Sequence, residues 1–278
     1  MRFRIAEIFK ELGLPAFAPS YKELYVLMFL VALVFAAILA KKRGLPPHRF
    51  YMATLITAAL ALLGSRLFYL LTHLSASSGL GVWALLTGDG TSSFGAYVLG
   101  ISGAVCCLRL LRIDTLRGLD VFAPVMAVAL IIGRLGCLSS GCCFGKPSAL
   151  PWAVSFPAGS PAYLAQASSG LIAADSASSL PVHPVQVYEI IFGLAALLVL
   201  LSKRARQTRN GLLFFRYIVA YALFRCFLEL FRDDPGATLL RPSIGQVLWF
   251  GASIAALTMA FRIAHKGNEE TIGCMQTN

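Results

Sequence analysis

Residues 120–138 read DVFAPVMAVALIIGRLGCL, an apolar run that is interrupted by one arginine close to its end. The run is close to the ~20 apolar residues that a helix needs to cross the hydrocarbon core of a bilayer. The whole chain has the same character, because 58% of its 278 residues are hydrophobic and only 13% are charged. This composition is typical of an integral membrane protein and excludes an ordinary soluble domain.

Similar apolar runs recur along the whole chain, and each is long enough to cross a membrane as a helix. We therefore predict an all-α integral membrane protein in which residues 1–278 form one polytopic domain with seven transmembrane helices. No internal repeat is evident, so a transporter built from inverted halves is not indicated. The predicted spans are 24–40, 50–72, 94–111, 120–138, 185–202, 211–231 and 243–262.

Positive charge concentrates in alternate connections, whereas connection 73–93 has no Lys or Arg and 139–184 has only Lys146. By the positive-inside rule, this distribution predicts an N-out/C-in topology. The net charge of +11 therefore reflects membrane topology, and no basic tail or aromatic-interleaved patch points to nucleic acid as a partner. The basic residues on the predicted cytoplasmic side are Lys41, Lys42, Arg43, Arg49, Arg109, Arg112, Arg117, Lys203, Arg204, Arg206, Arg209, Arg262 and Lys266.

Three segments lie outside the predicted spans. Residues 1–20 begin with an amphipathic stretch that we expect on the membrane surface, without a cleavable signal peptide. Residues 139–184 form a long extracytoplasmic loop, or small head, which is rich in Gly, Ser, Pro and Ala and includes a strand-like piece at 152–156. Residues 263–278 form a cytoplasmic tail.

Three of the ascending spans carry an arginine at about the same depth, two-thirds of the way toward the outer face. They are Arg66, Arg134 and Arg225. A central arginine costs roughly 2.5–3.5 kcal/mol on insertion scales, so three at one depth are most simply explained by an anionic ligand among them. The alternative is that they snorkel outward or pair with lipid headgroups and backbone carbonyls, and it applies most readily to Arg66.

Arg225, Glu229 and Arg232 follow one another at helical spacing i, i+4, i+7 and are predicted to share a face. Glu189, at the start of the fifth span, is the other acidic residue near this depth. The arginines therefore outnumber the carboxylates, and a phosphate, which accepts bidentate hydrogen bonds from arginine, would balance the surplus. Arg232 lies at the predicted interface, where a plain positional anchor is the alternative role.

A second polar cluster stands where the long loop re-enters the membrane. His183, Gln186, Tyr188 and Glu189 lie within seven residues at the start of the fifth span. Several hydrogen-bonding groups at a helix N-terminus are expected to cap it, and the charge of Glu189 suits the helix dipole there.

The ordered series of motifs across most of the chain resembles the prolipoprotein diacylglyceryl transferase family of bacterial inner membranes. The resemblance implies transfer of a diacylglyceryl group from phosphatidylglycerol to the thiol of a lipobox cysteine, in a site facing the outer leaflet. The matching segments are Tyr25-Val-Leu-Met28, the Arg66 segment, Gly133-Arg134-Leu-Gly136, Gly141-Cys-Cys-Phe-Gly145, Leu150-Pro-Trp152, His183-Pro-Val-Gln186-Val-Tyr188-Glu189, Tyr221 with Arg225, Glu229 and Arg232, and Ser243-Ile-Gly245-Gln246.

The resemblance also implies roles for individual residues. Arg134 would hold the lipid phosphate, Arg225 would be the second essential arginine, and Glu229 would orient Arg225. Arg232 would support the entrance to the site. The remaining residues expected to bind substrate are Tyr25, Arg66, Gly136, His183, Gln186, Tyr188 and Glu189.

The sequence departs from the family at two places. Members carry a His-Gly-Gly stretch at the start of the third span, but residues 92–97 here read SSFGAY. Cys137, Ser140 and Cys142 also replace polar signature residues, which leaves His183, Glu229 and, less suitably, Tyr25 as candidate proton acceptors.

Cys137, Cys142 and Cys143 lie within reach of Arg134, and a nearby cation lowers a thiol pKa and raises its reactivity. These cysteines are expected to carry thiol chemistry, to form a Cys137–Cys142 disulfide in an oxidising compartment, or to be small apolar filler. The loop shows too few ligands for zinc, so no metal and no cofactor is expected.

Three functions remain open. The first is diacylglyceryl transfer to a protein thiol, and the second is transfer to a different acceptor through the cysteine loop. The third is a non-catalytic relative that keeps only the anionic-lipid site. The missing histidine favours the second or third, whereas retention of Arg134, Arg225 and Glu229 argues against simple decay.

Overall fold

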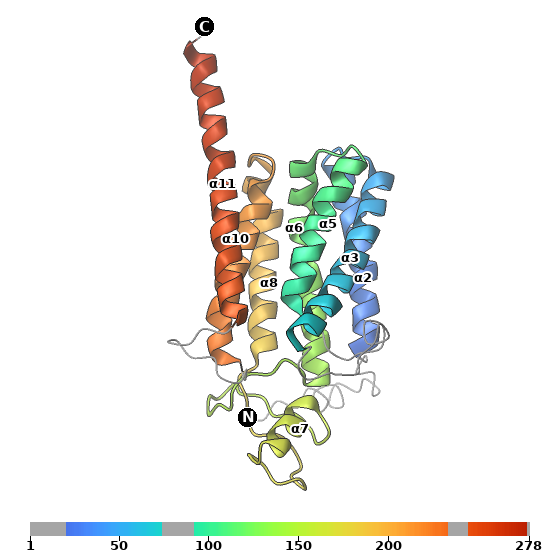
Figure 1. Ribbon diagram of the computed structural model, residues 1–278, viewed down its shortest axis with the longest axis vertical. Helices are drawn as coiled ribbons and strands as arrows, with labels where there is room; N and C mark the ends of the chain where they lie inside the picture. The colour runs from blue at the N-terminus through green and yellow to red at the C-terminus, as the bar shows by residue number, and fades with distance from the viewer. Residues whose placement is uncertain (1–20, 74–91, 233–243, 277–278) are drawn as a thin grey trace. The chain divides into compact units, whose positions relative to one another are not determined.

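The computed structural model describes residues 21–73, 92–232 and 244–276, so the predicted amphipathic segment 1–20 lies outside the described residues. Within the described residues the chain forms helices and loops, with isolated β-bridges and no strand. The strand-like piece predicted at 152–156 contributes one bridge, between Val154 and Val182. The helices are α2 (Tyr21–Lys42), α3 (Pro47–His73), α5 (Ser93–Leu110), α6 (Thr115–Ser140), α7 (Pro161–Ser168), α8 (Val185–Leu201), α9 (Lys203–Arg206), α10 (Leu212–Leu228), the 3-10 helix η2 (Glu229–Phe231) and α11 (Ile244–Gln276) (Figure 1).

Within the described residues, five helices are long and apolar enough to cross a membrane, which confirms the predicted helical membrane architecture. The two other predicted spans correspond to α8 and α10, which have 17 residues each. A helix of 17 residues is about 26 Å long, close to the ~30 Å of the hydrocarbon core. The seven-span count and the N-out/C-in orientation stay predictions. The five candidate spans are Glu23–Lys42, Pro47–Leu71, Ser93–Leu110, Thr115–Ser140 and Gly245–His265.

Large apolar side chains on these helices point outward rather than into a core. Val34 on α2, Leu198 on α8 and Phe261 on α11 are 60%, 75% and 67% exposed. Such exposure is costly in water and is the arrangement expected where lipid covers a helix. The apolar helix α11 also continues beyond the predicted end of the last span at residue 262 and reaches Gln276.

The chain divides into two compact units, and α2, α6, α10 and α11 each contribute to both. The first unit comprises residues Met1–Val31, Met126–Ser202 and Leu223–Gln246. The second comprises Ala32–Val125, Lys203–Ala222 and Val247–Asn278.

In the second unit, α3 and α5 pack against each other through glycines. A Cβ atom on Gly64 would collide with the carbonyl oxygen of Gly95, so these helices approach more closely than any larger residue allows. Asp120, a buried residue of α6, accepts hydrogen bonds from Gly211 N at 2.8 Å and Phe214 N at 3.0 Å. Its carboxylate therefore satisfies two of the backbone N–H groups that the start of α10 leaves open.

In the first unit, the second half of α6 packs against α8, where Gly193 leaves room for Ile131. The segment between these helices, residues 139–184, is called the head segment below. It carries the short helix α7, which begins because Ser160 accepts a hydrogen bond from Tyr163 N and Pro161 stands at its first turn. A small apolar core holds the head segment together, formed by Val154, Phe156, Ala162 and Val182 with Leu138 and Phe144 packed against it.

Candidate active site

Charged side chains from four elements of the first unit form a connected series of ion pairs. Glu189 on α8 lies at its centre: Oε2 accepts a hydrogen bond from Arg134 Nε at 2.8 Å, and Oε1 accepts one from Arg225 Nη1 at 3.3 Å. Arg225 Nη2 donates in turn to Glu229 Oε2 at 3.2 Å. These four residues, Arg134, Glu189, Arg225 and Glu229, are called the ion-pair network below. Arg134 and Arg225 are thus held by one carboxylate.

The ion-pair network is shielded from solvent. The side chain of Glu189 is 0% exposed, that of Arg225 is 5% exposed, and that of Arg134 is 11% exposed. Charges at such depth cost several kcal/mol each unless they are paired and hydrogen-bonded, which explains why the carboxylate of Glu189 uses both oxygens. With Arg232 included, these ion pairs join three guanidinium groups to two carboxylates, an excess of one positive charge among the five described residues.

Arg232 lies next to the ion-pair network, but its backbone is extended and not helical as the i, i+4, i+7 spacing predicts. The helix α10 ends at Leu228, and Glu229–Phe231 form a 3-10 turn. Arg232 is therefore extended and forms an antiparallel bridge with Gly145, while its Nε lies 4.0 Å from Glu229 Oε2. The predicted helical face shared by Arg225, Glu229 and Arg232 is wrong at its last residue, because pairing with the head segment draws the chain out of the helix.

Two buried polar atoms beside the ion-pair network have hydrogen-bonding capacity left. Arg225 Nε and Gln186 Oε1 have no hydrogen-bond partner within the described part of the chain. The side chain of Gln186 is fixed at its other end, since its Nε2 donates to the Cys142 carbonyl at 2.6 Å. An unfilled buried donor such as Arg225 Nε is costly, and an anion would satisfy it.

The polar cluster at the start of α8 does not cap the helix as predicted. Pro184 stands at the N-cap without a side-chain hydrogen bond, and the first turn has no acidic residue. The side chains are used in tertiary contacts instead: Gln186 binds the loop carrying Cys142, and Glu189 binds the two arginines. The attraction of a guanidinium at 2.8 Å outweighs that of a helix dipole, which contributes only ~0.3–1 kcal/mol.

Backbone hydrogen bonds join the two ends of the head segment to the end of η2. Gly145 N donates to the His183 carbonyl at 3.1 Å, and His183 N donates to the Lys146 carbonyl at 3.0 Å. Lys146 N donates to the Phe231 carbonyl at 2.8 Å, while its Nζ donates to the Leu230 carbonyl at 3.0 Å. These contacts bring three segments distant in sequence together next to the ion-pair network.

His183, Tyr188 and Trp152 form a linked set of rings in the same unit. Trp152 Nε1 donates to the Tyr188 hydroxyl at 2.9 Å, and His183 Nδ1 lies 3.3 Å from the same hydroxyl. The His183 ring also packs edge-on against Phe231, with 5.1 Å between the ring centroids. Burial lowers the pKa of His183 below its ordinary 6.5, so its imidazole is neutral at pH 7.

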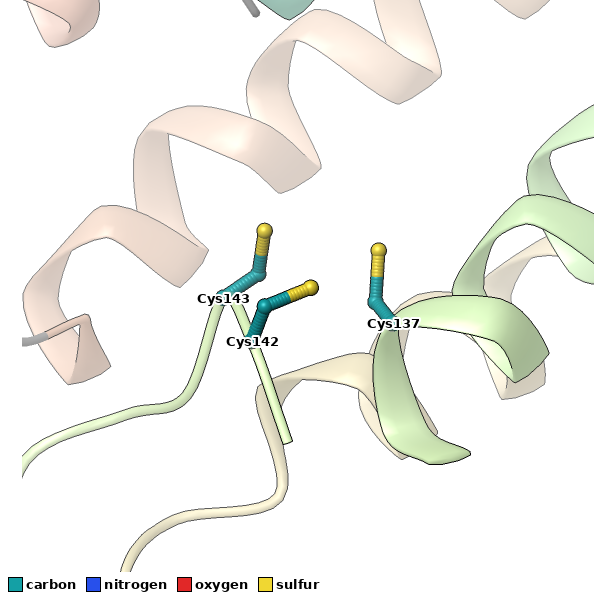
Figure 2. A group of neighbouring side chains, drawn as sticks. All are labelled: Cys137, Cys142 and Cys143. Atoms are coloured by element: carbon teal, nitrogen blue, oxygen red, sulfur yellow. The ribbon is translucent and has the colours of Figure 1, made fainter. Parts of the chain in front are cut away.

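Cys137, Cys142 and Cys143 bring their sulfur atoms together at the end of α6, as Figure 2 shows. The three Sγ atoms lie within 4.8 Å of one another, and all three residues are free thiols, so the Cys137–Cys142 disulfide, one of the alternatives from the sequence, is not formed here. Arg134 Nη1 lies 4.0 Å from Cys137 Sγ, and the Ser140 hydroxyl donates to Cys142 Sγ at 3.2 Å. The cysteines thus adjoin the ion-pair network directly.

The environment makes Cys143 the most acidic thiol of this cluster. Hydrogen bonds with Cys137 and then Cys142 lower the pKa of Cys143 well below its ordinary 9.0, and the charges of Arg134 and Arg232 add to the effect. For Cys142 the hydrogen bond with Cys137 lowers the pKa, but the bond with Cys143 and burial outweigh it, so the pKa is raised. One thiolate shared within the cluster is therefore favoured at Cys143.

The other predicted site residues are placed as follows. Gly136 lies on α6 between Arg134 and Cys137, and its carbonyl accepts hydrogen bonds from the Ser139 and Ser140 hydroxyls at 3.1 and 3.0 Å. Tyr25 lies on α2, in the same unit. Arg66 lies on α3 and belongs to the second unit, so its shared depth with Arg134 stays a prediction.

Two residues of the site were not among those predicted from the sequence. Trp152 donates to Tyr188, and Lys146 holds the end of η2. A signal for Lys146 was present, because it is the only Lys or Arg between 139 and 184. Trp152 lies within the segment that resembles the family but carried no indication of its partner.

Comparison with known proteins places this geometry in a family. A family model described as prolipoprotein diacylglyceryl transferase matches residues 17–262. A phosphatidylglycerol–prolipoprotein diacylglyceryl transferase from Geobacter sulfurreducens is 30% identical over 254 residues, covering 88% of this chain and 91% of the relative. The protein of the same name from Clostridium tetani is 26% identical over 241 residues, covering 87% and 90%.

A second clostridial relative matches nearly end to end. Phosphatidylglycerol–prolipoprotein diacylglyceryl transferase 2 from Clostridium perfringens is 26% identical over 285 residues, covering 98% of this chain and 99% of the relative. The matched region of the family model includes the whole ion-pair network and the three clustered cysteines. The chain therefore belongs to the prolipoprotein diacylglyceryl transferase family, as its motifs predicted.

Proposed function

We propose that this protein transfers a diacylglyceryl group from phosphatidylglycerol to the thiol of a lipobox cysteine in a lipoprotein precursor. The observation that carries the proposal is the buried ion-pair network, which together with Arg232 leaves one positive charge in excess. The names of the relatives specify the same donor and the same class of acceptor.

The reaction forms a carbon–sulfur bond and breaks a carbon–oxygen bond. The acceptor thiol loses its proton, its sulfur attacks the glyceryl carbon that carries the phosphate ester, and the electron pair of the C–O bond leaves with glycerol phosphate. Negative charge therefore grows on the departing phosphate. Guanidinium groups held in place before the reaction stabilise that charge without further reorganisation.

Arg134 and Arg225 are the residues to which we assign this stabilisation. Glu189 and Glu229 orient them, because Glu189 accepts a hydrogen bond from each guanidinium and Glu229 accepts a second one from Arg225. Arg225 Nε, which is buried and has no partner in the described residues, is a donor available to the phosphate. Removing a single donor of this kind typically lowers the rate about 10²–10³-fold.

His183 is the proton acceptor that the geometry supports best. Its pKa is lowered by burial, so the ring is neutral at pH 7 and retains a nitrogen lone pair. Glu229 is less suited because its ion pair with Arg225 stabilises the carboxylate. Tyr25 is weaker again, since a phenol is normally protonated at neutral pH.

One observation favours a second candidate function, in which an enzyme thiol accepts the diacylglyceryl group before a different final acceptor. The pKa of Cys143 is lowered, and its sulfur lies with two others next to Arg134. A thiolate at this place is a competent nucleophile toward a lipid held by the arginines.

We further propose how the protein is placed in the cell. It spans the inner membrane of a bacterium seven times in an N-out/C-in topology, and its site faces the outer leaflet. The support is the distribution of Lys and Arg, which leaves Lys146 as the only one in the head segment.

The test uses the purified full chain with phosphatidylglycerol labelled in its acyl chains, with and without a lipobox peptide. We expect label on the peptide from the wild type and at least a ~100-fold loss of rate in Arg134→Ala and Arg225→Ala. Arg134→Lys and Arg225→Lys, which keep the charge beside Glu189 but lose the planar fork, separate catalysis from folding. The exposed Arg216 on α10 supplies the matched control Arg216→Ala, which should keep full activity.

The outcomes distinguish the candidates. Label trapped on the enzyme and lost in Cys142→Ser or Cys143→Ser supports the second candidate. Lipid binding without turnover supports a non-catalytic relative. Full activity in both alanine variants of Arg134 and Arg225 would sink the assigned site.

A further inference from the structure

The three clustered cysteines have a geometry that a catalytic thiol alone does not require. Their sulfur atoms come from two elements, Cys137 from the last turns of α6 and the other two from the loop that follows it, and lie within 4.8 Å of one another (Figure 2). Small apolar filler needs no convergence, and one nucleophile needs no second and third sulfur. The arrangement matches the donor set of a soft metal ion.

The backbone around the cluster is shaped to bring these sulfurs together. Gly141 and Cys143 have positive φ angles of 71° and 55°, and a cysteine rarely adopts this left-handed conformation. Two hydrogen bonds hold the loop in place: Cys142 N donates to the Cys137 carbonyl at 3.1 Å, and Gln186 Nε2 donates to the Cys142 carbonyl at 2.6 Å. The loop is therefore fixed through the backbone of Cys142, which lies between Cys137 and Cys143 in the sequence.

The spacing fits a zinc ion. With Zn–S bonds of about 2.3 Å, three thiolates of a tetrahedral site lie about 3.8 Å apart. The observed limit of 4.8 Å therefore needs an inward movement of at most about 1 Å. Three thiolates around Zn²⁺ carry one net negative charge, and Arg134 Nη1 at 4.0 Å from Cys137 Sγ compensates it.

We propose that Cys137, Cys142 and Cys143 form a three-thiolate zinc site whose fourth position is open to an exogenous thiol. Three protein ligands with one open position is the pattern of catalytic rather than structural zinc. The site stands next to Arg134, to which the lipid phosphate is assigned, so both substrates of the transfer meet there. This half of the inference rests on the proposed function.

The zinc site supplies a means of deprotonating the acceptor thiol, which segment 92–97 lacks because it has no histidine. When the acceptor cysteine replaces a water on Zn²⁺, its proton passes to solvent water, in place of the His183 route, and its sulfur is bound as thiolate, because a coordinating thiol is deprotonated outright. That sulfur then forms the bond to the glyceryl carbon, and the C–O electron pair leaves with the phosphate. No histidine at residues 92–97 is needed for this deprotonation.

The first experiment measures metal binding by the full chain in detergent, without any turnover. Protein purified under reducing conditions is loaded with Zn²⁺ and dialysed, and zinc is measured by mass spectrometry. Co²⁺ is used in parallel as an optical probe of thiolate coordination. We expect about one zinc per chain in the wild type and in Cys106→Ser, an exposed cysteine outside the cluster. The variants Cys137→Ser, Cys142→Ser and Cys143→Ser should each lose it.

Conservative serine variants should still fold, and phosphatidylglycerol binding by each variant verifies that they do. A wild type that retains no more zinc than the triple serine variant overturns the site. Zinc retained by the triple serine variant also overturns the site. So does a wild type that loses two titratable thiols to a disulfide instead of binding metal.

The second experiment tests the open position. Addition of a lipobox peptide to the Co²⁺ form should strengthen the sulfur-to-cobalt absorption by one thiolate, and the same peptide with serine for cysteine should not. An unchanged spectrum with the cysteine peptide overturns the open position. Peptide lipidation by a zinc-free enzyme overturns the zinc role and leaves the proposed function standing. Zinc and peptide-thiol binding without any lipid transfer leaves the site standing and overturns the proposed function.

Discussion

Replacement of Glu189 by glutamine tests the ion-pair network at its centre. The change keeps the shape of the side chain but removes the one charge that both Arg134 and Arg225 contact, at 2.8 and 3.3 Å. At an effective dielectric of about 20, such contacts give roughly 6 and 5 kcal/mol of Coulomb attraction. Much of this is offset by the cost of removing the ions from water. The amide would also turn an N–H group toward one guanidinium.

Loss of one partner from a buried ion pair costs about 3–5 kcal/mol, and we expect Glu189→Gln to lie in this range. At about 2–4 °C per kcal/mol for a chain of this size, the midpoint of thermal unfolding in detergent should fall by roughly 6–20 °C. The matched control is Asp114→Asn, which breaks the exposed ion pair with Arg117 and should cost at most about 1 kcal/mol.

The same variant gives a second readout through the lipid. With Glu189 neutral, the excess of positive charge rises by one, and a bound phosphate replaces the missing carboxylate. Phosphatidylglycerol should therefore raise the unfolding midpoint of Glu189→Gln more than that of the wild type, whereas diacylglycerol, which has no phosphate, should raise both equally. A midpoint no lower than that of Asp114→Asn, or equal gains from the two lipids, would refute this account of the network.

Two further predictions follow from groups outside that network. Asp120→Ala should destabilise the protein by about 2 kcal/mol, because the Gly211 and Phe214 N–H groups lose their acceptor. Thermal unfolding in detergent measures this loss of stability. A loss below about 0.5 kcal/mol would contradict the prediction. Burial lowers the pKa of His183, so the folded state favours the neutral ring. The neutral ring therefore contributes to the free energy of unfolding above pH 6.5, and this contribution is lost as pH falls toward the lowered pKa. The unfolding midpoint should thus decline from pH 7 to pH 5, and His183→Gln should flatten that decline; an equal decline in both proteins would exclude His183 as its source.

The long apolar runs made the helices predictable, because a membrane demands continuous helix and leaves few alternatives. The end of the sixth span was less predictable. Helical spacing extends to Arg232, but the bridge to Gly145 comes from the head segment and overrides local preference. Contacts of this kind depend on residues far along the chain, which periodicity does not report.

The contacts among the candidate site residues were not predictable from the sequence. Glu189 was expected to face a helix dipole, whereas it binds Arg134 and Arg225, because the rotation of α8 about its axis determines which neighbours its carboxylate meets. The convergence of three sulfurs likewise depends on the positive φ of Cys143, a conformation that its residue type does not favour.

The hydrogen bonds between residues 145–146 and His183 also close off residues 147–182 as an excursion within the head segment. Residues 147–182 leave and return through this one closure, and Val154, Phe156, Ala162 and Val182 pack among themselves beyond it. Because doubling the length of a closed loop costs only about 0.6 kcal/mol, the excursion can lengthen, shorten or change sequence while the closure holds. The excursion can thus vary in length without moving the ion-pair network, provided that Trp152 still reaches the Tyr188 hydroxyl.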